Sequence, residues 1–339
     1  MQVSVFKYGH QNHHDLCEIS MVNDRGVQVK ILNYGATLES IVLPMVTGPR
    51  NVVLSLGGPE DYAKERNFLG GTVGRVVGRI RRGCWRMGNQ EVHLPLNDGP
   101  NHIHGGCGTD TKIYDFQTVY HENFVETILT LVDPDGSNGY PGNLKLQVRY
   151  RLDNFDSIEY SIRAITDKTT IFNPTNHAYF CLDGPNQRVE HAQLRIDSDF
   201  YLPLDSQSLP YMGEKSVVGT VFDFRKSVPI GQALNSNDSE IVAEHGLNHP
   251  YILTGCQPAV TLVAADKKVS MNITTKSPAV VVYTANHFNN QGITSNICQY
   301  NGVALEAQFP PAEDSDLSSI TLLPGEVFQT QTTWAFNFE

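Results

Sequence analysis

Residues 144–152 read Leu-Lys-Leu-Gln-Val-Arg-Tyr-Arg-Leu, and this stretch decides the fold class. Apolar and polar side chains alternate along it without a break, which is the period of a β-strand with one buried face. The same period returns in three other segments, 27–31, 158–164 and 269–273. Residues 327–336 add a run rich in strand-forming residues, which predicts a further strand close to the end of the chain.

Glycine and proline separate these segments, and helical periodicity is scarce. Residues 279–283 are apolar throughout and predict a strand that is buried on both faces. Only residues 59–65 resemble a short helix, with proline in the first turn. Many strands and few helices predict an all-β fold, a large antiparallel β-sandwich. No linker, repeat or change of composition interrupts the chain, so we expect residues 1–339 to form a single domain.

The composition disfavours several classes of partner. The chain has 339 residues with a formal net charge of −11, which argues against nucleic acid or an anionic membrane as the main partner. No apolar run approaches the roughly 20 residues that cross a bilayer, and the first residues lack the apolar stretch of a signal peptide. We therefore expect a cytoplasmic protein. The six cysteines are scattered without zinc-binding spacing, so we expect reduced thiols, with Cys107 a small packing residue.

Glu306 is the first candidate for chemistry. It lies inside the apolar segment 302–312, Gly-Val-Ala-Leu-Glu-Ala-Gln-Phe-Pro-Pro-Ala. An ionised carboxylate is costly to bury unless it is paired or hydrogen-bonded. Burial also raises the pKa of a carboxyl group toward the range that is useful for proton transfer. Gln308 lies on the same face of this strand by parity, so we expect it at the same site.

Two histidines are candidate partners of Glu306. His104 precedes two glycines in Asn-His-Ile-His-Gly-Gly (101–106), where the backbone can turn sharply and come close to a ligand. By parity, His102 is expected on the same face. The alternative interpretation is a turn with incidental histidines.

His177 lies in Asn-Pro-Thr-Asn-His-Ala-Tyr-Phe (173–180), where Asn176 and Tyr179 add polar groups to an apolar strand. A hydrogen-bonded core histidine is the alternative here. With Glu306 these histidines favour acid–base chemistry. The paired carboxylates of a glycosidase and a two-histidine, one-carboxylate metal site stay open from the residues alone.

Two further segments can supply binding groups. Arg79 lies in Gly-Arg-Val-Val-Gly-Arg-Ile (74–80), and an arginine fork suits hydroxyl or carboxylate recognition. A solvated charged strand is the alternative for the arginines that follow, Arg81 and Arg82. Asn248 precedes an apolar strand, where a turn cap is the alternative.

Taken in order, these motifs resemble those of the aldose 1-epimerase, or galactose mutarotase, family. The resemblance covers nearly the whole chain and is carried by residues 33–44, 74–80, 104–106, 139–142, 173–180, 305–310 and 323–326. It implies the galactose mutarotase-like supersandwich, which agrees with the strand pattern. It also implies an isomerase that interconverts the α and β anomers of a free monosaccharide such as galactose or glucose, without a metal or another cofactor. We expect a monomer or homodimer.

The resemblance assigns roles to the candidate residues. Glu306 matches the general base that takes the proton of the C1 hydroxyl, and His177 matches the general acid that protonates the ring oxygen. His104 matches a second histidine near the anomeric centre, and Arg79 matches an arginine that holds sugar hydroxyls. We expect Asn176, Gln308 and Asn248 to bind the sugar as well. The chemistry further predicts a raised pKa for Glu306 and a partner that keeps His177 protonated.

Three positions depart from the family pattern. Gly78 stands where the family often has asparagine, Asn248 where it has aspartate, and residues 108–114 differ from its Gly-Phe-Asp-Lys stretch and later tryptophan. All three lie in segments expected to hold the sugar, so we expect retained chemistry with altered or weakened sugar binding.

Two alternative functions stay open. The first is an epimerase of a phosphorylated or modified sugar, with Arg75, Arg81 and Arg82 as candidate phosphate ligands. The second is a sugar-binding protein without catalysis, which the changes at Gly78 and Asn248 would allow.

Overall fold

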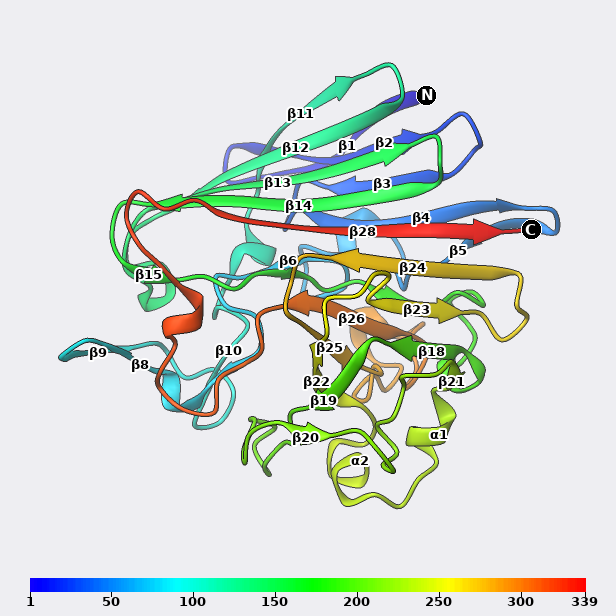
Figure 1. Cartoon of the computed structure of the whole chain (residues 1–339). Helices are drawn as coiled ribbons and strands as arrows, with labels where there is room; N and C mark the ends of the chain where they lie inside the picture. The colour runs from blue at the N-terminus through cyan, green and yellow to red at the C-terminus, as the bar shows by residue number, and fades with distance from the viewer.

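The computed structural model describes all residues, 1–339, and they form an almost entirely β structure (Figure 1). Antiparallel sheets of nine, six and five strands dominate it, and four two-stranded ribbons join them. The predicted all-β architecture of large antiparallel sheets is confirmed. None of the helices has the length and apolar character that crossing a bilayer requires.

The largest sheet contains residues 144–152, the stretch with the unbroken alternation of apolar and polar side chains. Its strands in spatial order are β11 (Asp115–Tyr120), β12 (Phe124–Asp133), β13 (Leu144–Asp153), β14 (Ser157–Thr166), β28 (Phe328–Phe338), β24 (Val269–Thr275), β23 (Val260–Val263), β18 (Gln193–Ile196) and β21 (Val228–Pro229). Every second residue of β13 is buried, beginning with Leu144. The alternation in the sequence is therefore the alternation between the core face and the outer face of this sheet.

The second sheet carries the site described below. Its strands in spatial order are β17 (Tyr179–Phe180), β26 (Val303–Gln308), β25 (Ala279–Tyr283), β22 (Asn248–Leu253), β19 (Ser198–Tyr201) and β20 (Lys215–Ser216). All six residues of β26 are buried. This strand passes through the middle of the molecule (Figure 1), which explains why its sequence is apolar on both faces around one carboxylate.

The chain begins with a five-stranded meander, and short ribbons connect the large sheets. The meander consists of β1 (Gln2–Gln11), β2 (His14–Val22), β3 (Gln28–Leu32), β4 (Thr37–Met45) and β5 (Gly48–Asn51). The ribbons pair β6 (Thr72–Val73) with β16 (Thr175–Asn176), β7 (Arg79–Ile80) with β10 (His102–Ile103), β8 (Cys84–Met87) with β9 (Gln90–His93), and β15 (Thr170–Ile171) with β27 (Thr321–Leu322).

The helices are short and differ from the one that the sequence predicted. Residues 59–65 form only a single 3₁₀ turn, Pro59–Asp61, and none of the three residues of this turn is buried to stabilise a longer helix. Two α-helices were not predicted, α1 (Gly231–Leu234) and α2 (Ser239–Glu244). Asp238 caps α2 by accepting a hydrogen bond from the N–H of Glu240 at 2.9 Å.

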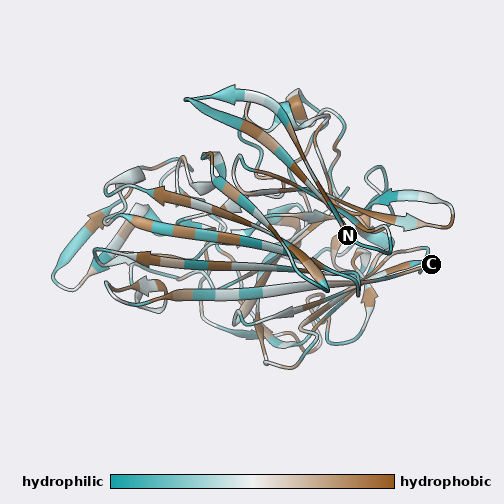
Figure 2. Ribbon diagram, turned by 90° about the horizontal axis from the view of Figure 1, so that it is seen from above, coloured by the Kyte–Doolittle hydropathy of each residue, from teal (hydrophilic) through white to brown (hydrophobic).

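One apolar interior connects the sheets. A cluster of 54 buried residues extends from Met21 to Phe336 and draws on the nine-, six- and five-stranded sheets. Trp334 of β28 stacks on Tyr160 of β14 and packs edge-on against Phe180 of β17, with ring centroids 5.8 and 5.7 Å apart. Figure 2 shows hydrophobic and hydrophilic residues alternating along the long strands, as this shared interior requires.

Candidate active site

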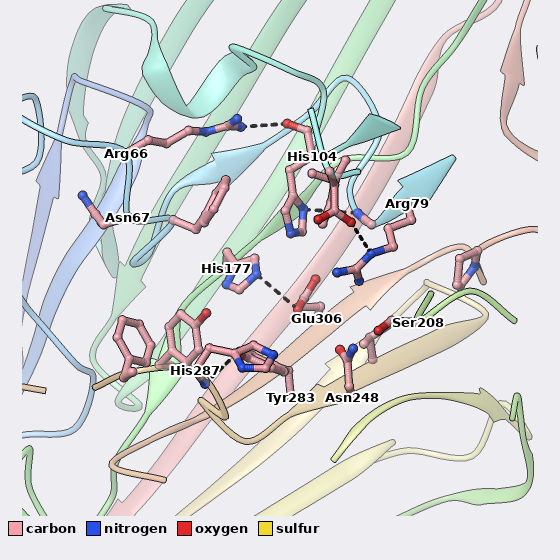
Figure 3. Close-up of a pocket in the computed structure, with 18 of the residues that line it drawn as sticks. Arg66, Asn67, Arg79, His104, His177, Ser208, Asn248, Tyr283, His287 and Glu306 are labelled. Atoms are coloured by element: carbon pink, nitrogen blue, oxygen red, sulfur yellow. Dashed lines mark hydrogen bonds and ion pairs between the residues drawn. The ribbon is translucent and has the colours of Figure 1, made fainter. Parts of the chain in front are cut away.

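A cavity of about 660 Å³ lies on one face of the six-stranded sheet (Figure 3). Glu306 of β26 pairs with Val281 of β25, which in turn pairs with Pro250 of β22. Side chains two apart on a strand share a face, and all three of these residues line the cavity. Tyr179, Tyr283 and Gln308 complete this floor, and Asn248 also lines the cavity. The parity that placed Gln308 beside Glu306 is therefore correct.

Loops from distant parts of the chain form the walls. They comprise residues 65–68, 78–79, 97–98, 103–104, 204–210 and 287–294, with Pro311. The lining is mostly polar, with aromatic rings among the polar groups. A cavity of this size and composition suits a small polyhydroxylated ligand.

Glu306 and His177 face each other at the base of the cavity (Figure 3). The Oε1 atom of Glu306 is 3.4 Å from Nε2 of His177, and the two residues are only 5% and 4% exposed. Burial raises the pKa of Glu306 to about 8. Burial also lowers the pKa of His177 to about 4, and the charge of Arg66 adds to this effect. The raised pKa of Glu306 agrees with the expectation from its sequence.

The expectation that a partner keeps His177 protonated is wrong for the unliganded site. Its Nδ1 atom is buried and has no hydrogen-bond partner, and the cost of burying a charged ring outweighs the groups that favour its protonation. Both shifts favour the neutral form of each group, so near neutral pH the pair shares one proton. Either group can act as the acid while the other acts as the base, because the pair has one proton and two sites for it.

His104 stands beside this pair as a neutral donor. The N–H of Gly78 donates to its Nδ1 at 3.2 Å, so its own proton is on Nε2. The ring lies edge-on to His177 at a centroid distance of 5.5 Å and 4.8 Å from the ring of Phe68. Burial holds the pKa of His104 well below its usual value. His104 can therefore donate one hydrogen bond without carrying a charge.

The structure explains how glycine can occupy position 78, where the family often has asparagine. The backbone N–H of Gly78 donates to the His104 ring, and its carbonyl accepts from the N–H of His104 at 3.1 Å. Gly78 has φ +74°, a left-handed conformation that glycine and asparagine adopt most readily. A Cβ at this position would meet nothing within 4 Å. The contact to His104 comes from the backbone and does not need a side chain at 78.

Arg66 was missed by the sequence analysis, yet it fixes the turn that carries His104. Its Nε and Nη2 atoms donate to both carboxylate oxygens of Asp110 at 2.7 Å, and Nη2 also donates to the carbonyl of His104 at 2.7 Å. A third donor reaches the carbonyl of Gly106. Figure 3 shows Arg66 extending across to this turn. Its partners are about 40 residues away along the chain, so no local pattern marks it.

The predicted sugar-binding residues divide into two groups. Arg79, Asn248 and Gln308 line the cavity. Arg79 donates from Nε to Asp98 at 2.6 Å, and the Oε1 atom of Gln308 is buried without a partner. Gln308 therefore has an acceptor left for a ligand.

The prediction for Asn176 is wrong. Its amide nitrogen donates to the carbonyl of Gly70 at 2.7 Å and to the hydroxyl of Tyr150 at 2.9 Å, and its oxygen accepts from the N–H of Ala178. The side chain is satisfied inside the core and does not line the cavity. His102 is likewise a core residue, held between the carbonyl of Pro95 and the hydroxyl of Tyr140.

Neither a metal site nor the candidate phosphate ligands are assembled at the cavity. No group of three histidine, cysteine, aspartate or glutamate side chains is arranged as a metal site. Arg75 is buried in an ion pair with Asp133, and Arg81 pairs with Asp205. Neither of these arginines nor Arg82 lines the cavity, so a phosphate in it would not meet them.

Comparison with known proteins decides the family. Residues 18–334 match the family model for aldose 1-epimerase. The chain belongs to the aldose 1-epimerase family. It is 32% identical to the aldose 1-epimerase of Escherichia coli K12 over 94% of both chains. It is also 32% identical to human galactose mutarotase, over 91% of this chain and 90% of the relative.

Solved structures agree with this assignment. The crystal structure of a galactose 1-epimerase from Lactobacillus acidophilus NCFM has a TM-score of 0.95 and 51% identity, and each chain is covered to 99%. An aldose epimerase homologue from C. elegans shares the fold with a TM-score of 0.84 at 22% identity. As a member of the aldose 1-epimerase family, the protein is an isomerase that interconverts sugar anomers.

Proposed function

We propose that Glu306 and His177 catalyse anomer interconversion by exchanging one proton with a free monosaccharide. The observation that carries this proposal is the buried carboxyl–imidazole pair, 3.4 Å apart at the base of a cavity of about 660 Å³. Opening a sugar ring removes a proton from one oxygen and adds a proton to another. No electrons are transferred, so a positioned acid and a positioned base are sufficient.

The reaction begins when the sugar fills the cavity. A hydroxyl that donates to Glu306 favours its ionised form, so the proton moves across the 3.4 Å contact to Nε2 of His177. Glu306 then takes the proton of the C1 hydroxyl while His177 protonates the ring oxygen. The bond between C1 and the ring oxygen breaks and C1 becomes an aldehyde. After rotation about C1–C2 the steps reverse, and the pair again holds one proton.

The remaining polar groups of the cavity would hold the sugar in place. The Nε2–H of His104 is available to an oxygen near the anomeric carbon, because its Nδ1 atom is already occupied by Gly78. Arg79, Gln308 and Asn248 would bind the other hydroxyls. Aromatic rings such as Phe68 and Tyr179 supply apolar surface for the carbon face of the sugar.

The substrate is proposed to be a free aldose such as galactose or glucose. The names of the relatives support this, since they include galactose mutarotase and galactose 1-epimerase. Polarimetry of freshly dissolved α-galactose, α-glucose and a panel of other aldoses would rank the substrates. Glucose 6-phosphate belongs in the panel, and a faster rate on it than on glucose would contradict the proposal.

Replacing either member of the pair is the direct test of the roles. We expect Glu306→Gln and His177→Asn each to lower kcat by about 10²–10⁴, because each removes one proton-transfer group. Polarimetry measures the rate, and circular dichroism checks that both variants fold. Full activity in both variants would overturn the assignment of roles.

We also propose that the protein is cytoplasmic and monomeric or dimeric. All six cysteines are free thiols, three of them exposed, as expected in a reducing compartment. Size-exclusion chromatography with light scattering would give the oligomeric state.

A further inference from the structure

Glu244 is a buried carboxylate directly behind one wall of the cavity. It is the last residue of α2 and is 7% exposed. No lysine, arginine or histidine side chain forms an ion pair with it, whereas Arg79 and Arg81 pair with Asp98 and Asp205. A buried carboxylate without a cation needs hydrogen bonds to stabilise it.

Its hydrogen bonds come from the cavity wall. The hydroxyl of Ser208 donates to both carboxylate oxygens, at 2.8 and 3.1 Å, and the amide nitrogen of Asn248 donates to Oε2 at 2.8 Å. Ser208 and Asn248 both line the cavity, and Figure 3 shows them side by side. Glu244 therefore contacts the cavity only through these two residues.

The carboxylate determines which atoms this wall presents. A carboxylate accepts hydrogen bonds and cannot donate them. It holds the amide of Asn248 with the nitrogen toward Glu244, since the flipped amide would place Oδ1 against the carboxylate oxygens. Oδ1 of Asn248 makes no hydrogen bond within the protein, and the single hydroxyl proton of Ser208 is already engaged. Two acceptor oxygens are thereby left for a ligand.

We propose that Glu244 is a positioning residue that sets sugar preference by orienting Asn248 and Ser208, so that this wall accepts a hydrogen bond from one sugar hydroxyl. This inference rests on the proposed function and names residues that determine its specificity. It also accounts for asparagine at 248. An aspartate at 248 would place a second carboxylate against Glu244, and the like charges would repel.

Deoxyfluoro sugars test the direction of the hydrogen bond, because fluorine in place of a hydroxyl cannot donate. We expect the wild-type protein to discriminate against one deoxyfluoro isomer of its best aldose by about tenfold in KM, the effect of one hydrogen bond. In Glu244→Gln the amide of Asn248 can flip, so this discrimination should fall several-fold. The kcat should change less than KM, because Glu306 and His177 are untouched.

A double-mutant cycle tests the repulsion. Asn248→Asp should raise KM more than Asn248→Asp combined with Glu244→Gln, in which only one carboxylate remains. An unchanged fluoro-sugar discrimination in Glu244→Gln would overturn the positioning role, as would equal KM values in the single and the double variant. If Glu244→Gln does not fold, Asn248→Asp is compared with Asn248→Ala in the wild-type background. A tighter-binding Asn248→Asp variant would then overturn the inference.

The outcome is distinguishable from failure of the proposed function. That function fails when the wild-type protein does not accelerate mutarotation in polarimetry. In that event the same sugars and variants are compared by calorimetric binding, where the predicted ratios are unchanged.

Discussion

Glu306 and His177 have pKa values that burial moves in opposite directions, to about 8 and about 4. Burial removes the water that would stabilise an ionised carboxylate or a protonated imidazole, so the neutral form of each group is favoured. The two shifts together hold one proton on the pair across the physiological range of pH. This single proton is what the proposed ring opening requires.

We therefore expect a bell-shaped dependence of kcat/KM on pH. Below pH 4 the pair gains a second proton and loses its base, and above pH 8 it loses its last proton and with it the acid. The two apparent pKa values belong to the pair as a unit. Polarimetric rates from pH 3.5 to pH 10 would measure the profile, within the range where the protein stays folded. A rate that keeps rising above pH 9 would contradict the assignment.

Glu306 also makes stability depend on pH. Its pKa is raised from 4.5 in the unfolded chain to about 8 in the folded protein, so the folded state binds the extra proton. Its contribution to stability is complete below pH 4.5 and is lost as the pH rises through 8. We expect Glu306→Gln, which stays neutral, to gain stability relative to the wild type as the pH rises from 5 to 9. Urea unfolding at several pH values measures the difference, and a constant difference would contradict the buried location.

Among single residues, the sequence identified the proposed reacting groups more easily than the residues that hold them in position. Glu306 and Gln308 were predictable because strand parity puts them on one face. Asn176 was expected at the site because it stands beside His177, but adjacent residues of an extended segment point to opposite faces. Arg66 carries no local signal, since its partners Asp110 and His104 lie 44 and 38 residues away.

The turn from His104 to Gly108 is the element on which the site depends most. A Cβ at Gly105 would lie 2.0 Å from the carbonyl oxygen of Gly74, and Gly105 has φ +70°. The chain thus passes over the 74–75 peptide in direct backbone contact. This contact and the hydrogen bonds from Arg66 fix the position of the His104 ring.

We expect Gly105→Ala to destabilise the protein far more than Gly136→Ala. Gly136 also has a positive φ, +82°, but a Cβ there meets nothing within 4 Å. The control, Gly136→Ala, therefore loses only the about 1–2 kcal/mol that a non-glycine residue costs in the left-handed conformation. Gly105→Ala adds a clash with the backbone. Urea unfolding gives both free energies, and polarimetry should show a lower rate for Gly105→Ala alone. Equal losses in the two variants would show that the close approach is unimportant.

The long strands were predictable and the helices were not, for a common reason. Residues 144–152 and 279–283 became β13 and β25 because a two-residue period or a continuous apolar run can be recognised within a few residues. The helices α1 and α2 have four and six residues, too few to display a period of 3.6. They form where Asp238 supplies a cap and the core accepts Ala233 and Ile241.

Over the whole molecule, the buried cluster shared by the large sheets leads us to propose that residues 1–339 form one domain. The two tryptophans report separately on the unfolding of two regions of the chain. Trp334 belongs to the cluster of 54 residues, and Trp85 lies in a smaller one with Ile80 and Tyr140. A single domain should unfold both regions together.

We expect the single-tryptophan variants Trp85→Phe and Trp334→Phe to unfold in one transition each. In each variant the fluorescence midpoint in urea should coincide with the midpoint from circular dichroism and from loss of activity. Fluorescence of Trp85 that changes at a lower urea concentration than circular dichroism would indicate a separate unit.

The alternation along β22 and β25 has a consequence for how such an enzyme acquires a new preference. Asn248, Pro250, Val281 and Tyr283 face the cavity, whereas the intervening His249 and Val282 are completely buried. Exchanging the first set leaves the second set and the backbone register in place. A combinatorial library over those four positions would vary sugar selectivity while the scaffold stays constant. This sheet is therefore well suited to directed evolution.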